Sequence, residues 1–514
     1  MKKSTLLMSL ALFAGTLCGN AATVTTSVMD ANTEGSLMKI IADTPSGTAT
    51  TIDFDFDGTE LVLPEGTNEM DLIGKVISFD GMNKKNNTPV ILSSVNRLFK
   101  MGAESDITFK NLKFTGCQNI AMTVTGTAKM TMTNCEAYNN KDVDKKVNGA
   151  VIRISGGTVV IDQCYFYENE SKGGYSGGVI CIYDGVNARI TNSSFVHNIS
   201  TNGGAIAVNS RADKATPEVY IANCTFANNY AADRGGAIYM QHAHKSNGFS
   251  PVVVNNTFVG NISGNPTSDD GGAINLWARA TAVAMTPVIV NNLFAQNFFD
   301  PWTSSRLNDI KCFYLEGDVS GGTEQPQTVN ATAYNNIFAA VEDKFVTIYG
   351  AKNGNKTLDF GKDKVFKATA EHPEDLPDEP PFHPTALLEG AVPTATLAEG
   401  SIAIGAGIAT LEGVEIPTTD AYGNARGANP AVGAVEFGST GAVNTIEVAK
   451  SSIIKAGDVL FISGAENTQV EIYDMAGKVM FTAPVSGEGV VAISSLNAGF
   501  YIAKVGNAVC KFVK

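Results

Sequence analysis

The sequence predicts an all-β protein, built as a parallel β-helix that is followed by a small C-terminal β-sandwich. Two short phrases, Gly-Gly-Ala/Val-Ile and Asn-x-x-Phe-x-x-Asn, alternate along the middle of the chain. Around them apolar and outward-facing residues alternate with a period of two, as in Ile238 to Gln241, which indicates strands rather than helices. Short strands that repeat between Gly and Asn corners are typical of a solenoid.

The two phrases recur throughout residues 163–297. The glycine phrase occurs at Gly177–Ile180, Gly203–Ile206, Gly235–Ile238 and Gly271–Ile274. The second phrase occurs at Gln163–Asn169, Asn192–Asn198, Asn223–Asn229, Asn255–Asn261 and Asn291–Asn297. Weaker copies extend the predicted solenoid in both directions, at Asn111–Phe114, Asn134–Asn140, Gly149–Ile152 and Asn335–Phe338.

Stacked coils, spaced at about 4.8 Å, place equivalent residues above one another. We therefore expect one internal column of phenylalanines, made by Phe166, Phe195, Phe226, Phe258 and Phe294. The first residue of each Asn phrase is expected to form an Asn ladder at one corner. Glycine pairs suit the other corner because they tolerate positive φ and close backbone approach. These asparagines are predicted to build the fold and to carry no chemistry.

The alternation of Gly-Gly-Ala-Ile with Phe-x-x-Asn over roughly residues 105–300 resembles the repeats of the polymorphic outer-membrane proteins. More broadly, it resembles the pectate-lyase-like β-helix superfamily, which implies a right-handed parallel β-helix. That fold serves adhesins, passenger domains, polysaccharide lyases and glycoside hydrolases, so the resemblance leaves the function open.

Residues 1–22 are predicted to be a secretory signal peptide. Lys2 and Lys3 precede an apolar run that ends at Leu17, and small residues up to Ala22 follow, which predicts cleavage after Ala21 or Ala22. Cys18 raises the alternative of lipidation, but Leu17 is larger than the small residue usual before a lipidated cysteine. No other run approaches the roughly 18 apolar residues that a transmembrane helix needs.

The composition agrees with an exported β protein, with 51 glycines and 17% charged residues. A net charge of -14 gives no electrostatic footprint for nucleic acid or anionic lipid. Cys135, Cys164 and Cys224 each directly follow the first residue of an Asn phrase. That equivalent placing predicts small buried fillers rather than a disulfide framework or a metal site.

No cofactor is predicted, and calcium stays an alternative to which no residue set can be assigned. Asp53, Asp55 and Asp57 alternate with phenylalanines near the start of the solenoid, which could suggest calcium. No glycine-spaced ligand loop follows them, so an outward-facing acidic strand is the favoured interpretation.

Insertions are predicted to gather on one side of the solenoid. After the glycine phrases the chain leaves its strand and returns at Pro217, Pro251 and Pro287, and proline is accepted at the first residue of a strand. Beside these loops, the outward positions of the glycine strands should form two columns. The first column is Arg153, Cys181, Ala207, Tyr239 and Asn275, and the second is Ser155, Tyr183, Asn209, Gln241 and Trp277.

Aromatic and amide side chains on a flat sheet, walled by loops, are suited to gripping a sugar chain. The candidate glycan groove therefore comprises Tyr183, Asn209, Tyr239, Gln241, Trp277 and Arg279. The alternative is a scattered set of exposed residues without a ligand.

No catalytic residues are predicted. Glycoside hydrolases use paired carboxylates, but Asp269 and Asp270 are adjacent and would point to opposite faces of a strand. Arg234 and Asp270 precede equivalent glycine phrases and are expected to form a salt bridge. His242 and His244 would share one face of a strand, and a solvated loop is favoured over a metal site for both.

The solenoid and its capping segments are predicted to span residues 23–437. Ser401–Gly407, Asp420–Arg426 and Val432–Phe437 resemble the closing segment of many bacterial secreted β-helix proteins. The resemblance implies a cap over the open end of the solenoid, with Asp420 and Arg426 as a structural pair.

Residues 438–445 are a predicted linker, and residues 446–514 form a separate module. Val470–Val479, Leu496–Val505 and the lysine-rich end of the chain closely resemble the C-terminal sorting domain of type IX secretion substrates. The resemblance implies passage through the type IX machinery to the surface or exterior of a Gram-negative bacterium. The alternative is a generic β-sandwich binding module.

Two functions of different class follow from the sequence. The first is a non-catalytic adhesin or glycan-binding surface protein, whose partner would be a polysaccharide or a host or cell-surface glycan. The alternative is a polysaccharide lyase or glycoside hydrolase that acts in the groove beside the loops.

Overall fold

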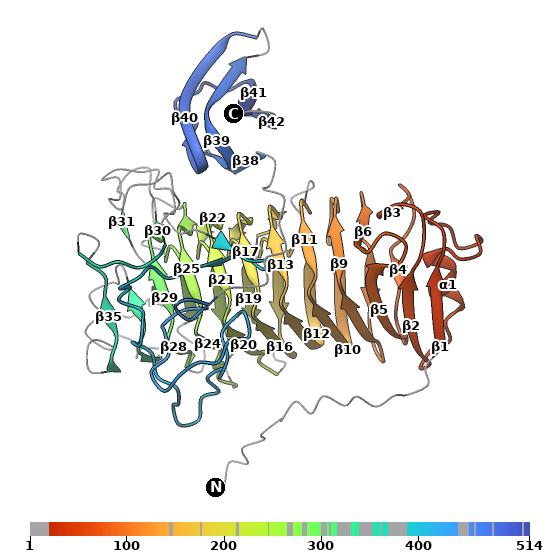
Figure 1. Cartoon of the computed structure of the whole chain (residues 1–514), viewed down its shortest axis with the longest axis horizontal. Helices are drawn as coiled ribbons and strands as arrows, with labels where there is room; N and C mark the ends of the chain where they lie inside the picture. The colour runs from red at the N-terminus through yellow and green to blue at the C-terminus, as the bar shows by residue number, and fades with distance from the viewer. Residues whose placement is uncertain are drawn as a thin grey trace, which may run out of the picture.

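The protein is an elongated right-handed parallel β-solenoid that is followed by a small antiparallel C-terminal sheet, as the computed structural model shows (Figure 1). The structure describes residues 20–142, 148–174, 177–211, 215–244, 246–264, 271–279, 285–299, 306–307, 310–315, 329, 331–338, 353–359, 362–367, 388–439, 452–456, 459–474, 477–505 and 508–514. The predicted signal peptide lies almost wholly outside these residues. Its last residues, Asn20–Ala22, belong to the first strand of the solenoid, and cleavage after Ala21 or Ala22 stays a prediction.

Sheet A is the longest of three parallel sheets. It begins with β1 (Asn20–Val24), β2 (Ala49–Phe54), β4 (Met70–Asp71), β5 (Val76–Asn83), β7 (Phe99–Met101) and β8 (Asp106–Lys110). Two long strands follow, β10 (Met122–Thr133) and β12 (Ile152–Asp162). In each later coil, two shorter strands take the place of one such long strand. The first halves are β15 (Ile180–Tyr183), β19 (Ile206–Ser210), β23 (Ile238–His242), β27 (Ile274–Arg279) and β32 (Ile310–Leu315). The second halves are β16 (Val186–Thr191), β20 (Glu218–Ala222), β24 (Val252–Val254), β28 (Val288–Val290) and β33 (Thr332–Tyr334).

Sheets B and C complete each coil. Sheet B contains β3 (Glu60–Leu63), β6 (Thr88–Ser94), β9 (Leu112–Thr115), β11 (Glu136–Tyr138), β13 (Tyr165–Tyr167), β17 (Ser194–Val196), β21 (Thr225–Ala227), β25 (Thr257–Val259), β29 (Leu293–Ala295), β34 (Ile337–Phe338) and β35 (Lys356–Thr357). Sheet C contains β14 (Glu170–Ser171), β18 (Ile199–Asn202), β22 (Tyr230–Arg234), β26 (Ile262–Ser263), β30 (Phe298–Phe299) and β31 (Arg306–Leu307). Successive strands pair in parallel within each sheet, except that β31 pairs antiparallel with β30.

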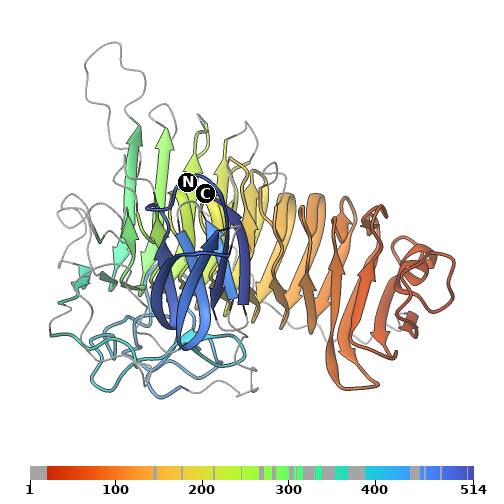
Figure 2. The same cartoon turned by 90° about the horizontal axis from the view of Figure 1, so that it is seen from above.

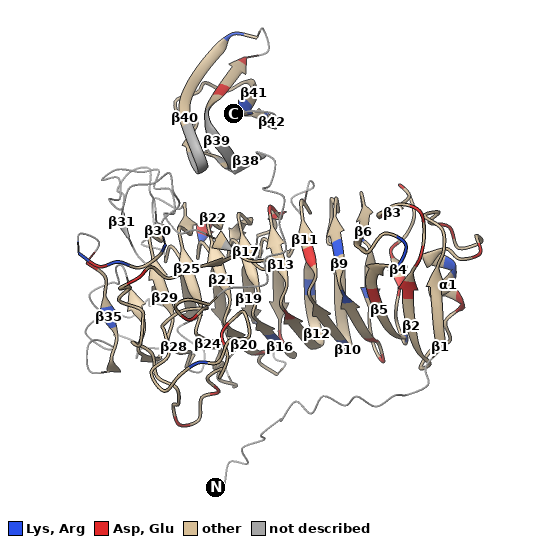
Figure 3. Cartoon of the chain, in the orientation of Figure 1, with Lys and Arg blue, Asp and Glu red and all other residues tan. Residues whose placement is uncertain are grey.

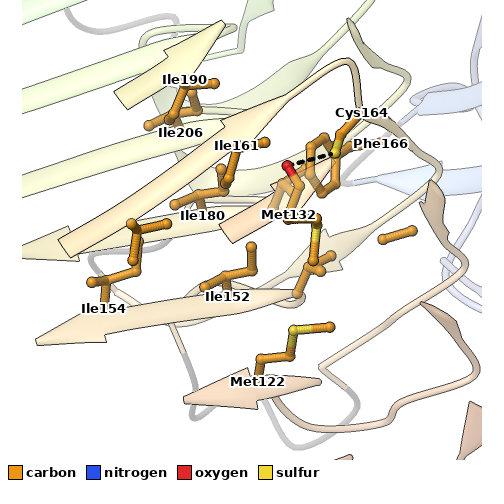
Figure 4. Close-up of a cluster of buried hydrophobic side chains, with 14 of the residues drawn as sticks. Met122, Met132, Ile152, Ile154, Ile161, Cys164, Phe166, Ile180, Ile190 and Ile206 are labelled. Atoms are coloured by element: carbon orange, nitrogen blue, oxygen red, sulfur yellow. Dashed lines mark hydrogen bonds between the residues drawn. The ribbon is translucent and has the colours of Figure 1, made fainter. Parts of the chain in front are cut away.

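The predicted phenylalanine column is confirmed. Phe226 stacks on Phe195 and Phe258 with ring centroids 4.9 and 4.8 Å apart and nearly parallel planes. The stack continues through Phe166, Phe294 and Phe338. Isoleucines and methionines of sheet A pack beside the column, and the Cys164 thiol donates to the Met132 carbonyl at 3.5 Å (Figure 4). Cys135, Cys164 and Cys224 are buried free thiols, as expected of fillers.

The Asn ladder lies elsewhere than predicted. It is formed by the last residue of each phrase, and each side-chain amide donates to the next side-chain carbonyl at 2.9–3.0 Å, through Asn140, Asn169, Asn198, Asn229, Asn261 and Asn297. The first residues instead take positive φ, such as 54° at Asn223, a conformation that asparagine tolerates well. That backbone requirement explains why asparagine recurs there, and only some of these residues also bond to each other, as Asn223 does to Asn192 at 3.0 Å.

The glycine corner behaves as predicted. Gly203 and Gly235 have φ of 64°, and a Cβ at Gly178 would lie 1.9 Å from the Gly204 carbonyl oxygen. Only glycine permits this backbone approach.

The insertions leave sheet A at one point of the coil and return at β20, β24 and β28, which start directly after Pro217, Pro251 and Pro287. Their described parts stack on one another, because Thr216 donates to the Gly248 carbonyl at 2.9 Å and Thr286 to that of Phe249 at 2.8 Å. The predicted gathering of the loops on one side is therefore confirmed for these residues.

The predicted end cap is wrong in its position. The described residues 388–439, which we call the strap, run along the flank of the coils, over sheet B and the second half of sheet A (Figure 2). The strap includes β36 (Leu388–Glu389) and β37 (Thr394–Ala395). It covers apolar side chains that point outward from the sheets and would otherwise be exposed to water. Among them are Val196, Ala222, Ala227, Val254, Val259 and Val290.

The expected pair of Asp420 and Arg426 is also wrong. Arg426 is buried and its Nη1 bonds to Glu436 Oε1 at 2.6 Å, while Nη2 bonds to Asn223 Oδ1 at 3.0 Å. Asp420 accepts instead from the backbone N–H groups of Tyr422, Asn424 and Glu436. Burial lowers the pKa of Arg426, and its carboxylate and carbonyl partners compensate the buried charge.

A helix that the sequence analysis missed, α1 (Leu37–Asp43), packs Leu37 and Ile41 into the first coils, and Ser36 caps its N-terminus.

The C-terminal module has its own core, and its described residues form five strands: β38 (Ser452–Ala456), β39 (Val459–Asp474), β40 (Val479–Ala492), β41 (Phe500–Val505) and β42 (Ala508–Val513). Among the described helices, none is long and apolar enough to cross a membrane.

Candidate functional site

The two predicted columns exist on the outer side of sheet A. Ala207 pairs with Tyr239 and Tyr239 with Asn275, while Asn209 pairs with Gln241 and Gln241 with Trp277. Tyr183 continues the second column beside Asn209. Ile182, Met240 and Leu276, between the columns in sequence, point into the core as predicted.

The expected exposure of these columns is wrong for three of the candidate residues. Asn209, Tyr239 and Gln241 are buried, whereas Tyr183 and Trp277 are only partly buried. The corners cause part of this burial, because each glycine corner folds against the start of the next strand. A Cβ at Gly203 would lie 3.0 Å from the backbone nitrogen of Tyr239. The side chain of Arg279, at the end of β27, lies outside the described residues.

The two partly buried aromatic residues each lie under an arginine. The Arg153 guanidinium carbon lies 5.2 Å from the centre of the Tyr183 ring, and that of Arg234 lies 5.3 Å from the Trp277 ring. These distances allow cation–π attraction. Asn148 also donates to the Tyr183 hydroxyl at 2.7 Å, and burial raises the pKa of that phenol.

The expected salt bridge between Arg234 and Asp270 stays a prediction, because Asp270 lies outside the described residues. Arg234 Nη1 lies 3.4 Å from Asp233 Oδ2. The arginine is therefore held between a neighbouring carboxylate and the Trp277 ring.

Among the described residues of the two columns, Gln241 is the one whose side-chain amide lacks hydrogen bonds at both of its polar atoms. Its side chain is fully buried, and neither Oε1 nor Nε2 has a hydrogen-bond partner in the described part of the chain. A buried polar group without a partner costs about 1–3 kcal/mol, so a native protein that keeps one has a reason for it.

His242 and His244 are not solvated. Both are buried, with ring centroids 5.7 Å apart, and His242 Nδ1 lies 3.2 Å from the Ser210 hydroxyl. His244 Nε2 lies 2.7 Å from Asp184 Oδ1, while Asp184 Oδ2 accepts from the Arg211 backbone N–H at 3.0 Å. This polar network joins the bases of the insertion loops.

Asp184 was missed by sequence reasoning, although a signal exists. Asp184 and Gly185 form the short turn between β15 and β16, at the same place where later coils carry their insertions. Alignment of the coils by their split strands would have placed the carboxylate beside the histidines.

The acidic residues near the start of the solenoid face outward, as predicted. Asp53 lies 2.8 Å from Lys84 Nζ and Asp57 lies 2.9 Å from Lys85 Nζ. These carboxylates thus serve ion pairs on the surface. Among the described residues, no group of three or more His, Cys, Asp or Glu side chains is placed to hold a metal ion.

Comparisons with known proteins agree with this architecture. A family model described as a right handed beta helix region matches residues 99–299, and one described as a secretion system C-terminal sorting domain matches residues 456–514. The chain is a right-handed β-helix protein with a secretion sorting domain. The resemblance of its repeats to those of polymorphic outer-membrane proteins is tested by neither match.

Among solved structures, this β-helix protein is similar to pectate lyase Bsp165PelA from Bacillus sp. N165, solved in complex with trigalacturonate. The two are 12% identical, with 63% of this chain and 82% of the lyase covered at a TM-score of 0.27. No curated protein matches the chain. The sorting domain indicates that the β-helix protein is secreted or displayed at the cell surface through the type IX secretion machinery.

Proposed function

We propose that this exported β-helix protein binds a polysaccharide without cleaving it, through the outer columns of sheet A. The observation that carries the proposal is the placing of Tyr183 and Trp277 in one column, each partly buried under an arginine. Tyrosine and tryptophan on a rigid sheet offer flat apolar faces and polar edges at little conformational cost. Sugar rings present matching faces and hydroxyl edges.

The spacing of the two rings suits an extended ligand. β15 and β27 are separated by the two intervening strands β19 and β23, so Tyr183 and Trp277 lie roughly 14 Å apart along the solenoid axis at the usual strand spacing. That length corresponds to several sugar units, which favours an oligosaccharide or polysaccharide over a single sugar. The amide of Gln241 lies beside Trp277 in the column but is fully buried, so the proposal rests on the two aromatic rings.

The proposal of binding without cleavage rests on the titratable groups that the described residues place beside the columns. The carboxylate of Asp184 is bonded to His244 and to the backbone N–H of Arg211, and the Asp184 and His244 side chains are buried at the base of the insertion loops. These groups are therefore committed to holding the loops. Arg234 is likewise held by Asp233 and Trp277.

A glycan array with the full chain tests the proposal, followed by titration of the polysaccharides that bind. Trp277→Ala is expected to weaken binding by about 1 kcal/mol or more, as removal of an aromatic anchor does, with little change in the melting temperature. Phe500→Ala in the sorting domain is the matched control, because Phe500 is 65% exposed. Reducing-end and unsaturated-product assays on the same polysaccharides should give no signal.

Two results would overturn the proposal. If Trp277→Ala lowers stability and leaves glycan affinity intact, the ring packs against its neighbours only. If products accumulate with time, the alternative of a lyase or hydrolase holds.

A further inference from the structure

The outer face of sheet B divides into a covered and an uncovered part. From β17 onward the strap lies on it, because the Ser194 hydroxyl bonds to the Pro393 carbonyl and the Ala434 N–H bonds to the Thr257 hydroxyl. Phe366 and Leu388 pack at the edge of this covered part. Among the described residues, the strap does not continue over β9 and β11.

A stack of three tyrosine rings stands at this edge. Tyr167 lies between Tyr138 and Tyr165, with ring centroids 4.9 and 4.4 Å away and interplanar angles of 7° and 25°. All three side chains are partly buried. Because Tyr167 covers one face of Tyr138, only the other face of Tyr138, toward β9, is left for another group.

The residues on that side are much shorter than the tyrosine. Tyr138 pairs in register with Thr115, and Thr115 with Ser93. The outward column therefore drops from a phenol ring to two hydroxyl side chains within two coils. We call this step, with Tyr138 as its wall and the partly buried Thr115 as its floor, the tyrosine step; Ser93 beyond it is buried.

Charged groups of both signs flank the tyrosine step. In the neighbouring outward column Lys113 Nζ lies 3.0 Å from Glu136 Oε2, and Glu60 accepts from the Ser93 hydroxyl at 2.6 Å. Figure 3 shows the basic band on β9 next to the acidic band on β11. Burial raises the pKa of Tyr138, so its phenol is a neutral hydroxyl at physiological pH.

We propose that the tyrosine step is a second carbohydrate-binding site, which takes an uncharged sugar unit against the ring of Tyr138. The ring supplies a stacking face, and Thr115, Lys113 and Glu136 supply hydroxyl, ammonium and carboxylate partners for sugar hydroxyls. The two carboxylates, within a chain of net charge -14, disfavour polyuronates and sulfated glycans. This site lies on a different sheet from the columns of sheet A and does not depend on the proposed function there.

The experiment measures binding of four neutral probes, namely cellohexaose, laminarihexaose, xylohexaose and mannohexaose, together with hexagalacturonate as the charged probe. Each is titrated against the full chain by calorimetry. A neutral probe is expected to bind, and Tyr138→Ala is expected to weaken it at least tenfold. Thr115→Trp fills the floor while keeping the tyrosine stack intact and should abolish the same binding, which covers the case in which Tyr138→Ala disturbs folding.

Trp277→Ala separates the two sites. Neutral-probe binding that survives Trp277→Ala but is lost in Thr115→Trp supports the tyrosine step, even if the sheet A site proves inactive. Binding that is lost only in Trp277→Ala overturns it, as does preferential binding of hexagalacturonate or the absence of binding by every neutral probe. A dimer seen by light scattering that Thr115→Trp converts to a monomer, without any probe binding, would also overturn it and assign the face to a second copy of the chain.

Discussion

Asp184 and His244 bond across two coils of the solenoid, with His244 Nε2 2.7 Å from Asp184 Oδ1. The same carboxylate accepts from the backbone N–H of Arg211 in the coil between them at 3.0 Å. Since Asp184 stands in the turn between β15 and β16 and the other two groups open the insertion loops, one side chain ties three successive coils together.

Asp184→Ala should therefore destabilise the solenoid. The change leaves the buried His244 imidazole without its acceptor, and such a group costs about 1–3 kcal/mol. Urea unfolding of the full chain measures the loss. The control is Asp57→Ala, whose carboxylate pairs with Lys85 on the surface at 2.9 Å and whose removal should leave the midpoint unchanged. Equal midpoints for both variants would contradict the role of Asp184.

Phe226→Ala should cost about 3–5 kcal/mol of folding free energy. Phe226 is fully buried and stacks on Phe195 and Phe258, and coils held rigidly on both sides cannot collapse into the cavity. Thermal and urea melts measure the change, with the exposed Phe500→Ala as the control. A melt like that of the parent protein would contradict the packing of the column.

Gln241→Met should stabilise the free protein by about 1 kcal/mol or more, because it removes a buried amide that has no partner among the described residues. Because the Gln241 side chain is fully buried, the same variant should bind a glycan as the parent protein does. The matched control is Asn229→Leu, which removes a buried amide bonded to both neighbouring coils and should destabilise. A loss of stability in Gln241→Met would mean that a buried water or ligand satisfies the amide.

The buried thiols should make the protein less stable in alkali. Burial raises the pKa of Cys117 and Cys224 to about 12 and that of Cys181 to about 11. In the unfolded chain a thiol ionises near pH 8.5, so the unfolded state binds fewer protons above that pH and stability falls as the pH rises toward the folded values. Urea midpoints between pH 8 and pH 10.5 measure the slope. Replacement of the three cysteines by alanine should make the slope shallower, with the remainder due to other buried groups such as Cys164, whose pKa is also raised by burial. An unchanged slope would contradict this origin.

Deletion of residues 446–514 should leave the β-helix folded and prevent its export. The C-terminal strands β38 to β42 form a hydrophobic core of their own, and the matched sorting domain is the part that addresses the secretion machinery. Circular dichroism of the truncated protein measures folding, and cell fractionation is expected to find it in the periplasm. Normal surface display would contradict the role of this domain.

The sequence by itself determined the repeat architecture. A phrase such as Asn-x-x-Phe-x-x-Asn satisfies the same local requirements in every coil, because parallel strands in register place identical residues on top of one another. The Phe226 column, the glycine corners and the proline returns at β20, β24 and β28 could therefore be read from spacing alone. The phrase did not tell which asparagine forms the ladder, since its two ends look alike in sequence and differ only in φ.

Only the tertiary structure decided where distant segments meet. Arg426 bonds to Asn223 and the strap lies along the flank instead of the open end, because outward apolar residues on several coils needed a cover that no single repeat reveals. The burial of Tyr239 and Gln241 and the pairing of Asp184 with His244 arise in the same way. A sequence repeat predicts contacts between equivalent residues of successive coils. The contacts above instead join different positions of the coil. They depend on how the corners, the loops and the strap fold over the sheets.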